Sequence, residues 1–180
     1  TLFRSTGTGV LYGKIKILNS MPPYMGGGEM IESVSLEKSS WNNLPHKFEA
    51  GTPNIAGFIG LGSAISYMNS IGLEKIKHIE TDLTNELYSE LGRIENIIFY
   101  GEKGSVPICS FNIKGIHSYD LGAILSEQGV CVRTGNLCAQ PATSFFKTNS
   151  FIRASLCFYN TKEEIHNFIN CLKRAIKMLS

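Results

Sequence analysis

A thiol stands in a turn within the stretch VCVRTGNLCAQP, which runs from Val130 to Pro141. An apolar run leads into this stretch, and Cys138 then lies among glycine, asparagine and proline, which favour turns. A cysteine in a loop can react, because loops lie at the surface, whereas a core cysteine acts as a small hydrophobe. Positive charge nearby favours the nucleophilic thiolate, and Arg133 precedes the cysteine in the same stretch. The sequence therefore indicates Cys138 as the candidate nucleophile.

The other four cysteines have a different setting. Cys109, Cys131 and Cys157 each lie in an apolar, strand-like run, and Cys171 lies in a helical pattern. The total is odd and no C-x-x-C spacing occurs, which favours free thiols in a reducing compartment and predicts a cytoplasmic protein. No metal site is predicted, and the four histidines are expected to be structural or solvated: His46, His78, His117 and His166.

Composition excludes several classes of protein. The 180 residues are 43% hydrophobic and 18% charged, which is typical of a globular protein. A net charge of +2 gives no reason to expect a nucleic-acid partner. No apolar run approaches the roughly 18 residues of a membrane helix, and the first residues do not resemble a signal peptide.

Helical periodicity predicts four helices that must position these residues. The first spans 53–71, with Thr52 as N-cap and Pro53 at the first helical position. Further helices are expected at 74–91 and 117–127. The last begins after Thr161, which forms a capping box with Glu164.

Short β-rich runs fill the spaces between these helices. NIIFYG and VPICSFNI predict a hairpin, and VCVR and FIRASLCF predict two more strands. Residues 53–180 therefore indicate an α+β domain with a small, largely antiparallel sheet. Residues 1–52 hold one expected strand, in TGTGVLYGK, followed by irregular chain over 20–50. They are too little to bury a core, so we interpret them as the last segment of a larger domain.

The motifs, taken in order, resemble one family. They are TGTGVLYGK, MPPYMGGGEMI, FEAGTPNIAGFIGLGSAI, HSYDLGAIL, VRTGNLCAQP and RASLCFYNTKEEI. Together they are similar to the C-terminal portion of the PLP-dependent cysteine desulfurases of aminotransferase class V, and the short loop at Cys138 favours the SufS-like, group II branch. The resemblance implies the small C-terminal domain of a fold-type I PLP-dependent transferase, preceded by the last segment of its large domain.

The resemblance also implies an activity and a set of partners. Such an enzyme is a homodimer that uses pyridoxal 5′-phosphate to convert L-cysteine to L-alanine. The sulfur leaves as an enzyme persulfide and passes to a SufE- or SufU-like acceptor for iron–sulfur cluster assembly.

Family roles carry over to four positions, and a fifth residue, Arg133, is placed beside them for its charge. Cys138 matches the cysteine that receives the sulfur, and Arg153 matches the arginine that binds the substrate carboxylate. Arg133 is placed with Arg153 at the substrate. Gly51 and Thr52 match residues that reach the cofactor phosphate of the neighbouring subunit.

Two departures from the family pattern change what is expected. The family's Schiff-base lysine precedes TG in a pattern like K-L-x-G-P-T-G, but Thr1 stands at its position here, and Arg4 and Ser5 replace glycine and proline. These 180 residues alone are therefore expected neither to bind the cofactor covalently nor to turn over cysteine. Before the cysteine, Asn136 and Leu137 replace the His-His or similar pair of group II.

Two alternatives to a desulfurase stay open at this point. A selenocysteine lyase or related Cβ–X lyase would share the same motifs. A non-catalytic truncated homologue that acts as a binding module would share them too, and the sequence before TG favours it.

Overall fold

The structure is a computed structural model that describes residues 7–104 and 106–180. Positions 1, 4 and 5, which bear on the family's lysine pattern, lie outside the described residues. The chain divides into two compact units, 1–71 and 72–180, called here the N-terminal and the C-terminal unit.

The C-terminal unit is built on a four-stranded antiparallel sheet. Its strand order is β3-β4-β6-β5. The hairpin expected from the sequence is confirmed, because β3 (Ile97–Tyr100) pairs with β4 (Ile108–Ile113). Strand β6 (Phe151–Ser155) lies between β4 and the short β5 (Arg133–Gly135).

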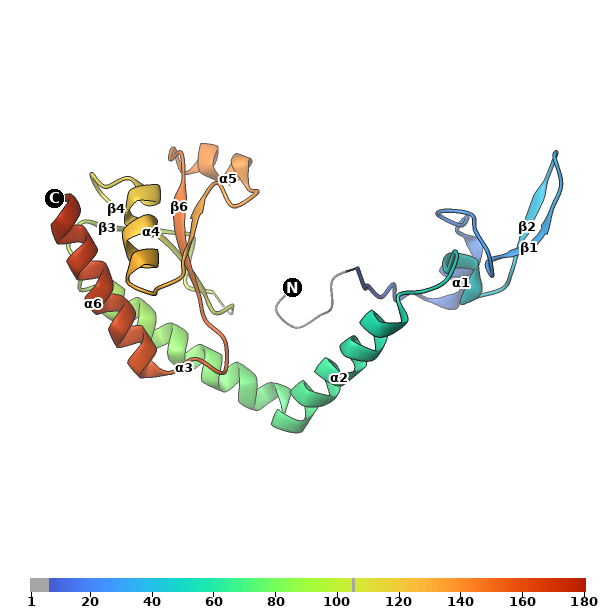
Figure 1. The fold of residues 1–180 in the computed structure, drawn as a ribbon, viewed down its shortest axis with the longest axis horizontal. Helices are drawn as coiled ribbons and strands as arrows, with labels where there is room; N and C mark the ends of the chain where they lie inside the picture. Colours follow the sequence, from blue (N-terminus) through green and yellow to red (C-terminus); the bar gives the residue numbers. More distant parts are fainter. Residues whose placement is uncertain (1–6, 105) are drawn as a thin grey trace. The chain divides into compact units, whose positions relative to one another are not determined.

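Three helices cover one face of this sheet. They are α3 (Leu73–Leu91), α4 (Ser118–Glu127) and α6 (Lys162–Leu179), which lie together on one side of the strands (Figure 1). The predicted capping box starts α6, since the Thr161 hydroxyl accepts from the Glu164 amide and the Glu164 carboxylate accepts from the Thr161 amide. The helices and the sheet share one core, which includes Leu87, Phe111, Leu121, Ile152 and Leu172.

The alternation of side chains along the strands divides the sheet into two faces. Ile152 and Ala154 of β6 are buried in the core, so Phe151 and Arg153 point to the opposite face, called here the open face. On that face Phe151 is itself buried against the rings of Tyr100 and Phe146. On β4, Phe111 belongs to the core, which places Ser110 and Asn112 on the open face. The open face therefore carries the polar side chains of the central strands.

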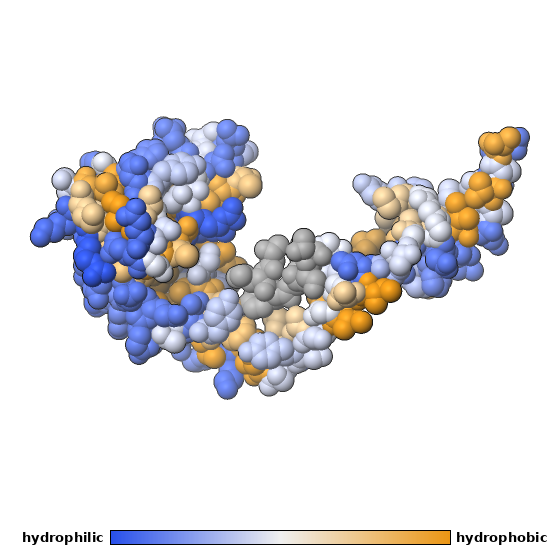
Figure 2. Space-filling model, viewed as in Figure 1, coloured by the Kyte–Doolittle hydropathy of each residue, from blue (hydrophilic) through white to orange (hydrophobic). Residues whose placement is uncertain are grey.

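The N-terminal unit has little core. It contains α1 (Ile15–Ser20), the hairpin of β1 (Ile31–Val34) and β2 (Ser39–Trp41), the 3-10 helix η1 (His46–Phe48) and α2 (Ile55–Ile71). Among its described residues, Met30 is the sole buried hydrophobic side chain. Hydrophobic surface is exposed along the β1–β2 hairpin (Figure 2), where Leu36 and Val34 are exposed.

Several sequence expectations fail in this unit. The strand expected in TGTGVLYGK is absent from its described residues, and residues 20–50 form the β1–β2 hairpin and η1 rather than irregular chain. Thr52 is not the N-cap of α2: the helix begins at Ile55, and the Oδ1 of Asn54 accepts from the Gly57 amide at 3.0 Å.

The sequence put a domain boundary at residue 52, whereas the compact units meet at 71 and 72. Helix α2 belongs to the N-terminal unit, where a Cβ on Gly57 would lie 2.5 Å from Cγ2 of Thr8. The assignment of residues 1–52 to a large domain stays a prediction.

Candidate functional site

Cys138 lies at the tip of a tight turn that follows β5. Leu137 and Cys138 both have positive φ, +55° and +60°, which is rare for residues other than glycine. Asn136 holds the turn, because its Oδ1 accepts from the Cys138 amide at 3.2 Å and its carbonyl accepts from the Ala139 amide at 2.9 Å. The Cys138 side chain is exposed. The turn therefore presents the thiol to solvent on a fixed backbone.

A short helix directly after Cys138 limits the length of the loop that carries this thiol. Helix α5 (Gln140–Phe145) was not expected from the sequence, and it begins two residues after Cys138 with Pro141 in its first turn. Proline is favoured there because the first turn does not need its missing N–H. The segment between the thiol and β6 is thus a short helix rather than a long mobile loop.

The remaining thiols divide into two kinds. Cys109, Cys157 and Cys171 are buried, whereas Cys131 is exposed. Cys131 precedes β5 and Cys157 follows β6, so the expectation that each lies in a strand is wrong. Burial raises the pKa of Cys109 to about 11, which makes its thiolate scarce at neutral pH. Two cysteines, Cys131 and Cys138, are therefore open to reagents in the described chain.

Two arginines face each other across strands β5 and β6. Arg133 pairs with Arg153 in register, so both side chains leave the sheet on its open face. The Nε of Arg153 is buried and has no hydrogen-bond partner among the described residues. Like charges directly opposite destabilise a sheet, and an unpaired buried donor costs about 1–3 kcal/mol. Both costs are relieved if an anion binds between the two guanidinium groups.

Ser110 also belongs to this arrangement, although the sequence did not single it out. It is the β4 partner of Arg153, on the opposite side from Arg133. The alternation of side chains in VPICSFNI predicts that Ser110 lies on the face opposite Cys109 and Phe111. It does not predict that Ser110 lies next to Arg153. Only the register between β4 and β6 brings the two together.

Gly51 and Thr52 belong to the N-terminal unit, before α2. Gly51 adopts a φ of +78°, and its amide donates to the carbonyl of Gly28 at 2.9 Å. The Gly51 amide is thus already engaged, so it is the exposed Thr52 that fits a contact to a phosphate.

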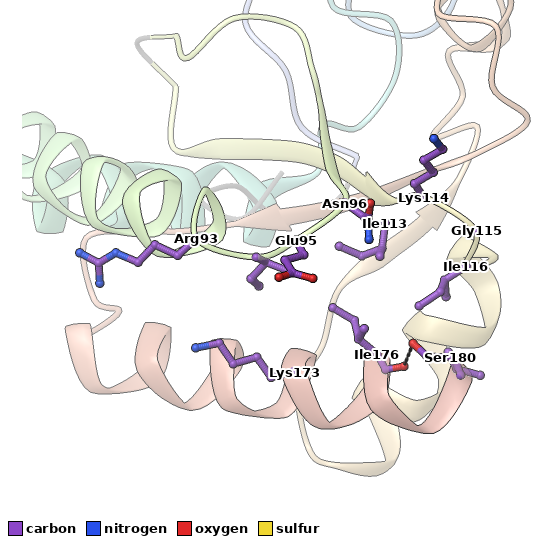
Figure 3. Close-up of a pocket in the computed structure, with 12 residues that line it drawn as sticks. Arg93, Glu95, Asn96, Ile113, Lys114, Gly115, Ile116, Lys173, Ile176 and Ser180 are labelled. Atoms are coloured by element: carbon purple, nitrogen blue, oxygen red, sulfur yellow. Dashed lines mark hydrogen bonds between the residues drawn. The ribbon is translucent and has the colours of Figure 1, made fainter.

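A hollow of the C-terminal unit lies away from these residues, between the β4–α4 turn and α6. It has a volume of about 550 Å³, and three cations lie on its rim: Arg93, Lys114 and Lys173. In Figure 3 the side chains of Arg93 and Lys173 extend toward the same side, and the side chain of Lys114 extends away from both. Arg93 is paired with Glu90. This hollow contains none of the five predicted site residues.

Within residues 7–104 and 106–180, no cluster of three His, Cys, Asp or Glu side chains could hold a metal ion. In the same ranges no helix combines the length and apolarity needed to cross a bilayer.

Comparison with known proteins identifies the class. The aminotransferase class-V family matches residues 2–168, and the chain belongs to this family. Among curated relatives, a probable cysteine desulfurase of Xylella fastidiosa strain Temecula1 is 45% identical over 179 residues, which cover 99% of this chain and 43% of the relative. The chain thus spans less than half the length of this relative.

Solved structures agree with this result. The cysteine desulfurase CsdA from Escherichia coli, in an S-sulfonic acid form, superposes with a TM-score of 0.93 at 32% identity, over 99% of this chain and 45% of CsdA. The protein C-DES, solved with glycine covalently linked to its PLP cofactor, shares the fold at 19% identity with a TM-score of 0.72, over 89% of this chain and 40% of its own. The expected α+β fold and the resemblance to cysteine desulfurases are confirmed.

Proposed function

We propose that this chain carries the sulfur-accepting thiol and the carboxylate-binding arginine of a PLP-dependent cysteine desulfurase. The observation that carries the proposal is the orphaned, buried Nε of Arg153 opposite Arg133, on the strand pair that leads into the exposed Cys138. A guanidinium with an unused donor suits a carboxylate, because its planar fork makes two parallel hydrogen bonds.

Each residue then has a distinct role. Arg153 binds the α-carboxylate of L-cysteine, and Arg133 adds positive charge beside it. The thiolate of Cys138 attacks the substrate Sγ, so that an S–S bond forms while the Cβ–Sγ bond breaks and its electron pair stays with the carbon. Protonation of that carbon gives L-alanine, and Cys138 is left as a persulfide.

One residue of the N-terminal unit is suited to contact the cofactor. Pyridoxal phosphate, when bound, supplies an electron sink for the carbon atoms of the substrate. The exposed Thr52 would contact its phosphate, and Gly51 would shape the turn without offering its amide. The family's lysine pattern falls on positions outside the described residues, so the expected inactivity of these 180 residues alone stays a prediction.

We further propose that the chain belongs to the SufS-like branch of the family. The short turn at Cys138 and the helix directly after it support a SufS-like role. In that role a cytoplasmic homodimer hands its persulfide to a SufE- or SufU-like acceptor for iron–sulfur cluster assembly. An exposed persulfide at the tip of a turn is accessible to such a protein.

The test uses a full-length desulfurase that carries these 180 residues as its C-terminal part. With L-cysteine, mass spectrometry should find an added sulfur on Cys138, together with released alanine. Cys138→Ala should abolish the persulfide, and Cys131→Ala, which removes the other exposed thiol, should leave it unchanged. Sulfur carried by Cys131 or by a buried cysteine would contradict the assignment, and exclusive turnover of selenocysteine would favour a lyase.

A further inference from the structure

The backbone pairing between β4 and β6 ends one residue beyond Arg153, at Ile152. The last backbone pairs are Ser110 with Arg153 and Phe111 with Ile152. The following residue, Asn112, is still paired on its other side with Ile98 of β3. Asn112 therefore lies in a continuous part of the sheet at the point where its neighbour β6 begins.

The side chain of Asn112 continues the ladder where the backbone stops. Its Oδ1 accepts from the Ile152 amide at 3.2 Å, and its Nδ2 donates to the Ser150 carbonyl at 2.8 Å. These two bonds flank Phe151, as the peptide groups of a neighbouring parallel strand would. One carboxamide thus fixes the first residues of β6, immediately before Arg153.

The same side chain reaches the segment that arrives from the thiol. Nδ2 also lies 3.2 Å from the Tyr100 hydroxyl and 3.4 Å from Oγ1 of Thr148. Thr148 and Ser150 follow α5, which itself follows Cys138. Ser150 is buried, and its hydroxyl lies 2.5 Å from that of Ser118 at the start of α4. The network therefore joins β3, β4, α4 and the chain between Cys138 and Arg153.

We propose that Asn112 is a positioning residue for the desulfurase site: it fixes the register of β6, and with it the place of the Arg153 guanidinium relative to the turn of Cys138. The inference rests on the function proposed above. A slip of one residue would send Ile152 or Ala154 to the open face, and Arg153 into the core. On the β4 side the backbone pairs reach Ile152, and Asn112 extends the hydrogen bonding from there to Ser150, on the N-terminal side of Arg153.

The test compares Asn112→Ala with Asn112→Asp in a full-length desulfurase that carries this chain. The alanine variant removes both bonds, while the aspartate variant keeps an acceptor for Ile152 and loses the donor to Ser150. We expect KM for L-cysteine to rise about tenfold or more in the alanine variant and less in the aspartate variant. A purely structural role would lower the folded fraction, and thus kcat per total protein, without changing KM.

Two controls make the result decisive. Asn170→Asp adds the same charge at an exposed position of α6 and should leave KM unchanged. Arg153→Ala, measured in parallel, separates the two proposals: a raised KM there with an unchanged KM in both Asn112 variants overturns the positioning role alone. An unchanged KM in Arg153→Ala overturns the proposed function and the positioning role with it. If the alanine variant does not fold, KM of the aspartate variant decides.

Discussion

Arg153 has a buried hydrogen-bond donor that the described residues leave unsatisfied. Its Nε is buried without a partner, and its cross-strand neighbour Arg133 is another cation. A bound carboxylate would satisfy the donor and reduce the repulsion between the two guanidinium groups. If the proposed site is correct, Arg153 should therefore be more stable with a carboxylate bound than without one.

Loss of this guanidinium should weaken binding of the amino acid rather than the fold. In a full-length desulfurase that carries this chain, Arg153→Ala is expected to reduce affinity for L-cysteine by about 2–5 kcal/mol. Arg153→Lys should recover only part, because an ammonium lacks the planar fork. Titration of substrate binding measures the change. Equal affinities in Arg153→Ala and the unmodified protein would remove Arg153 from the site.

The five thiols should differ sharply in reactivity. In the folded 180-residue chain, iodoacetamide should label Cys131 and Cys138 and leave Cys109, Cys157 and Cys171 unmodified. Burial raises the pKa of Cys109 to about 11, so its protection should persist as the pH is raised to about 9. Peptide mass spectrometry reads each site, and labelling after denaturation provides the control. Labelling of Cys109 as fast as Cys138 would show that the core opens.

At the scale of elements, α4 and β5 approach each other through one glycine. A Cβ on Gly122 would lie 2.5 Å from Cγ2 of Thr134, a separation that real Cβ atoms do not tolerate. Thr134 lies between Arg133 and Gly135 and pairs with Ile152 of β6. The close contact therefore constrains the distance between α4 and the short strand that carries Arg133.

Gly122→Ala should consequently destabilise the protein, by about 1–3 kcal/mol. The alanine improves helix propensity, which lowers the net cost, but it forces α4 and β5 apart. Thr134→Ser removes the clashing methyl group, so the double variant should recover most of the loss. Urea unfolding of the two single variants and the double variant measures this coupling. Additive losses in the double variant would mean that the strain lies elsewhere.

The sequence predicted the C-terminal elements well because their signals are local. The capping box at Thr161 and the apolar periodicity of α3 and α6 are complete within single segments. The pairing of Arg133 with Arg153 and the position of Asn112 depend on register between strands far apart in the chain, which no local pattern encodes. Sequence could nominate both arginines but could not place them opposite each other.

The N-terminal elements were predicted less well, because their local signals conflict. The glycines and prolines of MPPYMGGGEMI favour turns, yet Ile31 begins a strand immediately after them. Thr52 followed by Pro53 is a good helix start, but Asn54 provides the capping oxygen instead. Two nearby residues can each cap a helix, and the choice between them depends on the surrounding chain.

At the scale of the whole molecule, the two units differ in what holds them together. The core cluster runs from Leu83 to Ala175 and lies wholly in the C-terminal unit. The N-terminal unit has an apolar groove of about 820 Å³ and exposes Ile55, Phe58 and Ile59. Apolar surface of this kind is costly in water, so this unit has too little buried area to be stable by itself.

Residues 72–180 expressed alone should therefore fold, and residues 1–71 alone should not. The first fragment is expected to unfold cooperatively on heating, because it keeps every member of the core cluster, and the second to show no transition. Leu172→Ala in the first fragment should cost about 2–5 kcal/mol, since that side chain is fully buried. Circular dichroism with temperature measures all three proteins. A cooperative transition in 1–71 would show that the N-terminal unit is stable by itself, and its absence in 72–180 would show that the core of the C-terminal unit depends on the N-terminal unit.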